Sequence, residues 1–297
     1  MTEPVHRIGQ KTSGAWGLHT ATIDWCEDNY THSHYVAEWY NTISNIPFIL
    51  LGLFSAYSCL APHLQPNRKP LPDAKRHAAG NIGIMCIGFG SAIFHATLKW
   101  HAQVLLDELP MIFVTSLVLY RVCADEERWR GENAWKLKVG LAAVPLSVSA
   151  IYLYYPNPVL HQVCFGILLF ACTHRTFYLF KTAPPTVPAS DLRAARHYIF
   201  TGSLLFILAF GIWNVDNGHA WWHLLTGLGC TRIGVGTSCD WLIWTRFVGV
   251  SKVPWCVRVD VACAWVGSCY QVENNSSYQE GKGRWWINGS VKMDKWQ

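Results

Sequence analysis

The sequence predicts an all-α integral membrane protein, a bundle of seven transmembrane helices with a lumenal N-terminus and a cytosolic C-terminus. The first observation behind this prediction is composition. Of the 297 residues, 51% are hydrophobic and only 14% are charged, which is too apolar for an ordinary soluble protein of this length. The second is a series of long apolar runs, and the third is the gathering of basic residues in alternate loops.

The apolar runs divide the chain into predicted membrane crossings. At ~1.5 Å per residue, each of the first six is long enough to cross most or all of a ~30 Å hydrocarbon core. A seventh begins at His219. Sixteen Trp and twelve Tyr fit this interpretation, because these rings gather at membrane–water interfaces. The six runs cover residues 43–61, 78–98, 102–123, 139–155, 159–180 and 198–215.

The charges of the loops predict the orientation. Lys and Arg are concentrated in loops 62–77, 124–138 and 183–196, whereas the intervening connections carry only Lys99. The positive-inside rule places the basic loops in the cytosol and the N-terminus on the lumenal or extracellular side. The first twenty residues lack the apolar core of a cleavable signal, so the first helix is expected to act as the targeting element.

Three parts are expected along the chain. Residues 1–38 form a lumenal N-terminal segment, and residues 39–250 form the seven-helix membrane domain. Residues 251–297 are rich in Trp and Cys without periodicity, and we expect an unstructured cytosolic tail. The eleven Cys include no C-x-x-C pair, which argues against a zinc ribbon. A net charge of +5 without basic–aromatic blocks argues against a nucleic-acid partner. The sequence predicts no oligomeric state.

Three histidines near the predicted lumenal face form the main candidate site. His219 and His223 are four residues apart and share one helix face, and His95 ends an apolar run on the same side. Three neutral imidazoles with one open position make a hydrolytic zinc site, because the metal lowers the pKa of its bound water to ~7. A nearby carboxylate, Asp107, is expected to take the proton from this water. Ser91, one turn before His95, is expected to stabilise a developing oxyanion.

The alternative for each histidine is a structural hydrogen bond to a backbone carbonyl inside the bundle. The four-residue spacing, together with a third histidine on the same side, favours a metal for the cluster. The remaining intramembrane candidates lack such a pattern and are expected to be structural. They are His101, His161 and His174.

A second candidate site lies in residues 24–38 of the N-terminal segment. Asp24, Glu27, Asn29 and Glu38 are hard oxygen donors in an irregular segment, a combination that suits calcium. Their spacing is not that of an EF-hand loop, and spacing alone favours a solvated acidic cap. Asn29 also heads a glycosylation sequon, but an asparagine bound to a metal would not be glycosylated.

Several stretches between about residues 16 and 229 resemble, in order, sequences of the alkaline ceramidases, seven-helix hydrolases of the endomembrane system. They are WCEDNY, AEWYNTISN, FHATLKW, LLDELPMI, WNVDN and HAWWHLLTGLG. The resemblance implies a zinc-dependent amidohydrolase in the membrane of the endoplasmic reticulum or Golgi. Such an enzyme cleaves the N-acyl amide bond of ceramides, including phytoceramide or dihydroceramide, into a sphingoid base and a fatty acid. Its partners would be ceramide and membrane lipid.

The same resemblance implies the roles of individual residues. It implies zinc on His95, His219 and His223, with Ser91 and Asp107 at the reacting centre. For the N-terminal segment it implies calcium, in place of the solvated acidic cap that spacing favours. The implied calcium ligands are Asp24, Trp25 through its carbonyl, Glu27, Asn29 and Glu38.

One departure from the family pattern concerns the distance along the chain between two site residues. The family has one residue fewer between the positions that correspond to His95 and Asp107, so Val104 is an extra residue in this chain. One inserted residue rotates a helix by ~100°. Asp107 therefore reaches the site only if a turn or a bulge absorbs Val104.

Two further departures concern the end of the membrane domain. Only Gly218 separates WNVDN from HAWWH, and the stretch after Gly229 contains Arg232 and Asp240. Arg232 is expected near mid-membrane, at a cost of roughly 2.5–3.5 kcal/mol, with Asp240 two turns away as a possible partner. These departures predict that the chain is weakly active or inactive compared with a relative that has an unbroken seventh helix.

Two other functions remain open from the sequence. The first is a non-catalytic or receptor-like seven-helix protein of the same superfamily, to which adiponectin-type receptors belong, with a structural zinc. The second is an intramembrane serine protease that uses Ser91. Its G-x-S-x-G context is missing, so the protease is the least supported of the three.

Overall fold

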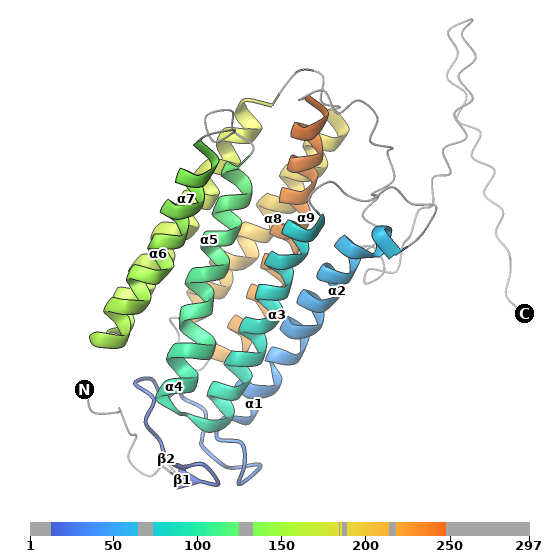
Figure 1. Ribbon diagram of the computed structural model, residues 1–297. Helices are drawn as coiled ribbons and strands as arrows, with labels where there is room; N and C mark the ends of the chain where they lie inside the picture. Colours follow the sequence, from blue (N-terminus) through green and yellow to red (C-terminus); the bar gives the residue numbers. More distant parts are fainter. Residues whose placement is uncertain are drawn as a thin grey trace, which may run out of the picture.

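The computed structural model describes residues 13–64, 74–124, 133–183, 185, 189–213 and 218–247. These residues form an elongated bundle of helices with a two-stranded hairpin at one end (Figure 1). The hairpin pairs β1 (Ser13–Gly14) with β2 (Gly17–Leu18). The helices are α1 (Trp39–Ile43), α2 (Asn45–Leu64), α3 (Ala74–Thr97), α4 (Trp100–Ala102), the π-helix η1 (Gln103–Glu108), α5 (Leu109–Cys123), α6 (Ala134–Tyr154), α7 (Pro158–Lys181), α8 (Ala189–Trp213) and α9 (His219–Phe247).

Six helical segments among the described residues are long and apolar enough to cross a membrane. Each overlaps one of the six predicted apolar runs. The predicted all-α class is therefore confirmed, and the chain has the make-up of a multi-pass membrane protein. The seventh crossing and the lumenal and cytosolic sides stay predictions. The six segments are Trp39–Leu60, Ala74–Thr97, Trp100–Cys123, Ala134–Tyr154, Pro158–Lys181 and Leu192–Trp213.

The N-terminal segment packs against the end of α3 through backbone hydrogen bonds. The amides of Thr20 and Ala21 both donate to the carbonyl of Leu98, each at 3.1 Å, and the amide of Glu38 donates to the carbonyl of His95 at 3.0 Å. Leu98 has a φ of 48°, which is uncommon for a residue with a side chain, and it directly follows α3. These contacts fix the segment over the end of the bundle that holds His95.

The predicted seventh segment forms the continuous helix α9, although it is not among the six segments apolar enough to cross a membrane. It lies alongside α8 (Figure 1). A Cβ atom on Gly202 of α8 would lie 2.8 Å from the carbonyl oxygen of Gly229 of α9, and the reverse distance is 2.9 Å. Small residues at such a crossing allow membrane helices to approach closely.

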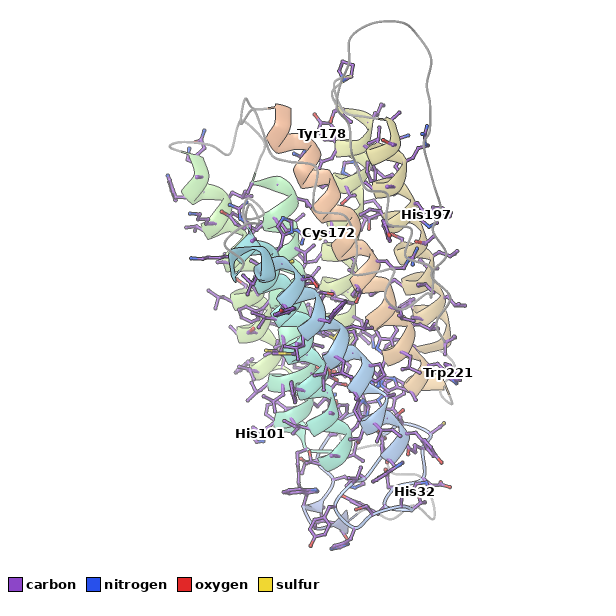
Figure 2. All side chains as sticks on the ribbon, turned by 90° about the vertical axis from the view of Figure 1, so that its right-hand side faces the viewer. His32, His101, Cys172, Tyr178, His197 and Trp221 are labelled. Carbon is purple, nitrogen blue, oxygen red and sulfur yellow. The ribbon has the colours of Figure 1, made fainter. Side chains whose placement is uncertain are left out.

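Arg232 lies about 20 Å along α9 from its first residue, and α8 supplies its partners. Its Nε atom donates to Thr201 Oγ1 at 2.8 Å, and its guanidinium lies over the ring of Tyr198. A further guanidinium nitrogen is 3.3 Å from Nε2 of His197, which lies in the half of the bundle away from the N-terminal segment (Figure 2). The side chain of the expected partner, Asp240, lies outside the described residues.

The extra residue Val104 lies in η1, between α4 and α5. The amide of Leu109 donates to the carbonyl of Val104, five residues back instead of the four of an α-helix. This wide turn is the bulge that the sequence requires. The predicted junction at residues 214–217, the tail at 251–297 and most of loops 62–77 and 124–138 lie outside the described residues.

Candidate metal centre

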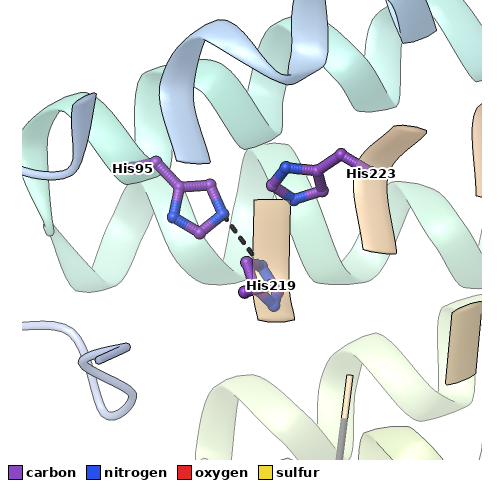
Figure 3. Close-up of side chains that lie close together, drawn as sticks. All are labelled: His95, His219 and His223. Carbon is purple, nitrogen blue, oxygen red and sulfur yellow. Dashed lines mark hydrogen bonds between the residues drawn. The ribbon is translucent and has the colours of Figure 1, made fainter. Parts of the chain in front are cut away.

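The three predicted zinc ligands lie together at the end of the bundle that the N-terminal segment covers. His95 is in the last turn of α3, and His219 and His223 are in the first two turns of α9. One nitrogen of each ring lies within 4.8 Å of the others, and all three side chains are buried. The Nε2 atoms of His95 and His219 are 3.2 Å apart and face each other (Figure 3).

Polar side chains lie against Nδ1, the nitrogen on the far side from the cluster, in two of these rings. His95 Nδ1 is 2.5 Å from a carboxylate oxygen of Glu38, to which it donates. His223 Nδ1 is 2.8 Å from Ser44 Oγ, and the Ser44 hydroxyl itself donates to the carbonyl of Asn41. Asn45 Nδ2 lies 3.3 Å from the same nitrogen of His223. In His95 the lone pair is left on Nε2, and Nε2 is the nitrogen that both rings direct into the cluster.

The third ring is oriented by stacking. The Trp25 indole lies on His219, with centroids 3.7 Å apart and an interplanar angle of 18°. His219 Nδ1 is buried and has no hydrogen-bond partner among the described residues. The Trp25 amide in turn donates to Glu38 at 3.0 Å. The N-terminal segment therefore contacts two of the three histidines, one through Glu38 and one through Trp25.

Ser91 and Asp107 lie beside this cluster. Ser91 Oγ is 3.3 Å from His223 Nε2, and the side chains of Ser91 and Asp107 are hydrogen-bonded to each other. Ser91 is buried on α3, whereas Asp107 on η1 is half-buried. Both side chains predicted to act on the reacting atoms are therefore close to the predicted metal ligands.

The predicted calcium ligands gather around the start of α1. Asn29 donates to Asp24 at 3.1 Å, and Glu27 accepts from the amides of Tyr40 and Asn41 at 2.7 and 2.9 Å. Burial raises the pKa of Glu27, and the nearby Glu38 carboxylate adds to this rise. Crowded carboxylate and amide oxygens of this kind fit a hard cation such as calcium. The Asn29 side chain is buried, so its sequon is not presented to solvent.

The histidines predicted to be structural lie outside the cluster. His161 donates from Nε2 to the carbonyl of Glu108 at 2.8 Å, which is the backbone hydrogen bond expected for it. His101 and His174 are exposed, and their ring contacts are with Trp100 and Phe170.

Three contacts of the site were missed from the sequence: the bond from His95 to Glu38, the bond from His223 to Ser44, and the Trp25 stack. The stretch AEWYNTISN contained a signal for two of them. It places several polar residues at the start of an apolar run, where a buried polar group needs a partner. No comparable signal pointed to the stack.

Comparisons with known proteins match the chain to one family. The chain matches the family described as Ceramidase over residues 17–218. It is 34% identical to alkaline ceramidase 3 of Mus musculus over 239 residues, which cover 73% of this chain and 82% of that protein. It is 32% identical to alkaline ceramidase YPC1 of Saccharomyces cerevisiae, with 73% and 75% covered. An alkaline ceramidase of Arabidopsis thaliana is also 32% identical, with 71% and 80% covered.

Proposed function

This chain belongs to the ceramidase family, and on that premise we propose that it hydrolyses the N-acyl amide bond of ceramides to a sphingoid base and a free fatty acid. The observation that carries the proposal is the buried cluster of His95, His219 and His223, with Ser91 and Asp107 beside it. The names of the relatives support the reaction class. The cluster and the two side chains beside it are residues of this chain that are suited to carry out that reaction.

The histidine cluster is proposed to hold zinc. Its donors are three imidazole nitrogens, and neutral imidazole is a preferred zinc ligand. The Glu38 carboxylate fixes the lone pair of His95 on Nε2. When bound, zinc would polarise the substrate carbonyl and lower the pKa of a bound water to ~7. Ligand rings fixed by hydrogen bonds on their far side are typical of such sites.

Asp107 and Ser91 are proposed to act on the reacting atoms. The oxygen of water bonds to the amide carbonyl carbon while Asp107 accepts a proton from that water. Ser91 turns its hydroxyl from Asp107 to the carbonyl oxygen as that oxygen gains negative charge. The carbon–nitrogen bond then breaks, and Asp107 returns the proton to the nitrogen of the leaving sphingoid base.

The position of the cluster suits a lipid substrate. The histidines lie at the covered end of a bundle whose outer helix surfaces carry many exposed apolar side chains. A two-chain lipid in the adjacent bilayer could therefore keep its tails in hydrocarbon while its amide reaches the cluster. We place this end on the lumenal side of the endoplasmic reticulum or Golgi membrane, following the charges of the loops.

The N-terminal segment, residues 1–38, is proposed to bind calcium in support of the membrane catalytic domain at residues 39–250, with residues 251–297 as a cytosolic tail. The crowding of acidic side chains near the start of α1 supports the calcium proposal. The proposed ligands are Asp24, the Trp25 carbonyl, Glu27, Asn29 and Glu38.

Release of labelled fatty acid from ceramide by the purified full chain tests the proposed function. We expect the unmodified chain to release fatty acid. His219→Ala should lose both its zinc and its activity, and Ser91→Ala should keep its zinc but lose most of its turnover. One missing oxyanion donor costs about 2.7–4 kcal/mol, or roughly 10²–10³-fold in kcat. His174→Ala, at an exposed position, is the matched control. A receptor-like protein would bind zinc but release no product, and that result would end the proposal.

A further inference from the structure

A buried carboxylate next to Asp107 has no part in the reaction proposed above. Glu108 is 8% exposed, and both of its carboxylate oxygens have partners. One accepts from Gln103 Nε2 at 3.1 Å, and the other accepts from the Tyr152 hydroxyl at 2.5 Å. In an α-helix the side chains of adjacent residues point in directions about 100° apart. Glu108 accordingly contacts Tyr152 of α6, while Asp107 contacts Ser91 of α3.

The partners of Glu108 connect the two ends of the π-helical turn. Gln103 is the first residue of η1 and Glu108 is the last, so their hydrogen bond spans the wide turn that absorbs Val104. Gln103 also donates to the Thr22 hydroxyl at 2.8 Å and accepts from the Thr22 amide at the same distance. π-Helical turns are rare and are frequently found at functional sites, so the side chains that stabilise this turn are candidates for a functional role.

Two other helices contact the backbone of this turn. His161 of α7 donates to the carbonyl of Glu108 at 2.8 Å. A Cβ atom on Gly90 of α3 would overlap the carbonyl oxygen of Leu106. The backbone of α3 therefore lies directly against the turn, next to Ser91. Only glycine permits this approach, which brings the Ser91 hydroxyl to Asp107.

We propose that Glu108 is a positioning residue for Asp107. Through Gln103 and Tyr152 it fixes the π-helical turn, and the turn directs the Asp107 carboxylate toward Ser91 and the histidine cluster. Glu108 itself makes no contact with the reacting atoms. This inference rests on the proposed function, because Asp107 is assigned its role there. A positioning role explains why Glu108, which does not reach the histidine cluster, is buried beside Asp107, which does.

The inference predicts different results for two substitutions. Glu108→Gln can keep both bonds, since its amide oxygen accepts from Gln103 and its amide nitrogen donates to the Tyr152 hydroxyl. Glu108→Ala removes both. Displacement of a reacting group by about 1 Å can cost about 100-fold. We therefore expect kcat to fall about 100-fold in Glu108→Ala with KM and zinc content unchanged, and to fall less than about 5-fold in Glu108→Gln.

The shape of the pH–rate profile separates positioning from proton transfer. If Glu108 itself transferred the proton, neither variant could do so, because neither glutamine nor alanine ionises. Both variants would then lose activity equally, and the pH–rate profile would lose one limb. We expect both variants to keep the pH dependence of the unmodified chain. Equal loss in Glu108→Gln and Glu108→Ala, or normal turnover in Glu108→Ala, would overturn the inference.

Backbone hydrogen exchange gives a readout that does not depend on activity. Amides 104–109 should exchange faster in Glu108→Ala than in Glu108→Gln or the unmodified chain, while amides of α7 stay unchanged. If Glu108→Ala fails to fold, Tyr152→Phe serves instead, because it removes one of the two bonds; unchanged exchange and unchanged kcat in that variant would refute the inference. An unmodified chain that releases no fatty acid would contradict the proposed function, and the exchange result would still decide whether Glu108 fixes the turn.

Discussion

Glu38 is the residue through which the N-terminal segment reaches the histidine cluster. One carboxylate oxygen accepts from the Trp25 amide, and the other lies against His95 Nδ1 and accepts from the side chain of Asn41. The resemblance assigns Glu38 to calcium, and the geometry adds a bond to a proposed zinc ligand. A side chain shared in this way makes the two proposed metal sites dependent on each other. Glu27 accepts from the backbone amides of Tyr40 and Asn41 at the start of α1.

Substitution of these two carboxylates should therefore have different effects. Glu38→Ala removes the acceptor of His95 Nδ1 and should weaken zinc binding about 10- to 100-fold, together with loss of the calcium response. Glu27→Ala should weaken the calcium response and leave zinc content unchanged. Zinc content after dialysis and ceramide turnover across a calcium titration measure both effects. Full zinc retention in Glu38→Ala would show that its bond to His95 is not needed.

At the scale of the elements, α9 depends on its crossing with α8. Gly202 and Gly229 bring the two backbones together, and Arg232 lies one turn farther along, against Thr201. The sequence predicted the unfavourable charge of Arg232 but not its partners, because they follow from the register between two helices. It did predict that Val104 needs a bulge, since one extra residue in a helix has a fixed rotational effect.

A bulky residue at the crossing should disturb the metal centre from a distance. Gly229→Leu would place a Cβ 2.9 Å from the carbonyl oxygen of Gly202, so α9 must move and carry His219 and His223 with it. We expect reduced zinc content and a lower thermal transition. Gly166→Leu is the matched control, because a Cβ there meets nothing within 4 Å. Equal zinc content in the two variants would mean that α9 can shift without moving its histidines.

At the scale of the whole molecule, the regular helices were predicted, whereas the fold of the N-terminal segment was not. Hydrophobic runs gave the six spans, and the spacing of His219 and His223 predicted their shared face, because helix geometry is local. The contacts of Trp25 and Glu38 could not be predicted, since they depend on how residues 19–38 fold back over α3. The orientation of the bundle rests on loop charges alone, and it determines which compartment the site faces.

Glycosylation mapping tests this orientation. A sequon placed in an N-terminal extension should be glycosylated, whereas sequons inserted into loops 62–77 or 124–138 should not. Endoglycosidase-sensitive shifts in gel mobility measure both outcomes. Glycosylation of either loop would place the histidine cluster on the cytosolic side and contradict the proposed lumenal site.

We propose that hydrolysis depends on a metal held by His95, His219 and His223. To test this, metal is removed from the purified full chain with a chelator, calcium is restored, and ceramide turnover is measured as zinc is added back. We expect no turnover in the metal-free protein and a linear return of turnover that ends at one zinc per chain. Full turnover without metal, or return of turnover in a His219→Ala/His223→Ala chain, would contradict it.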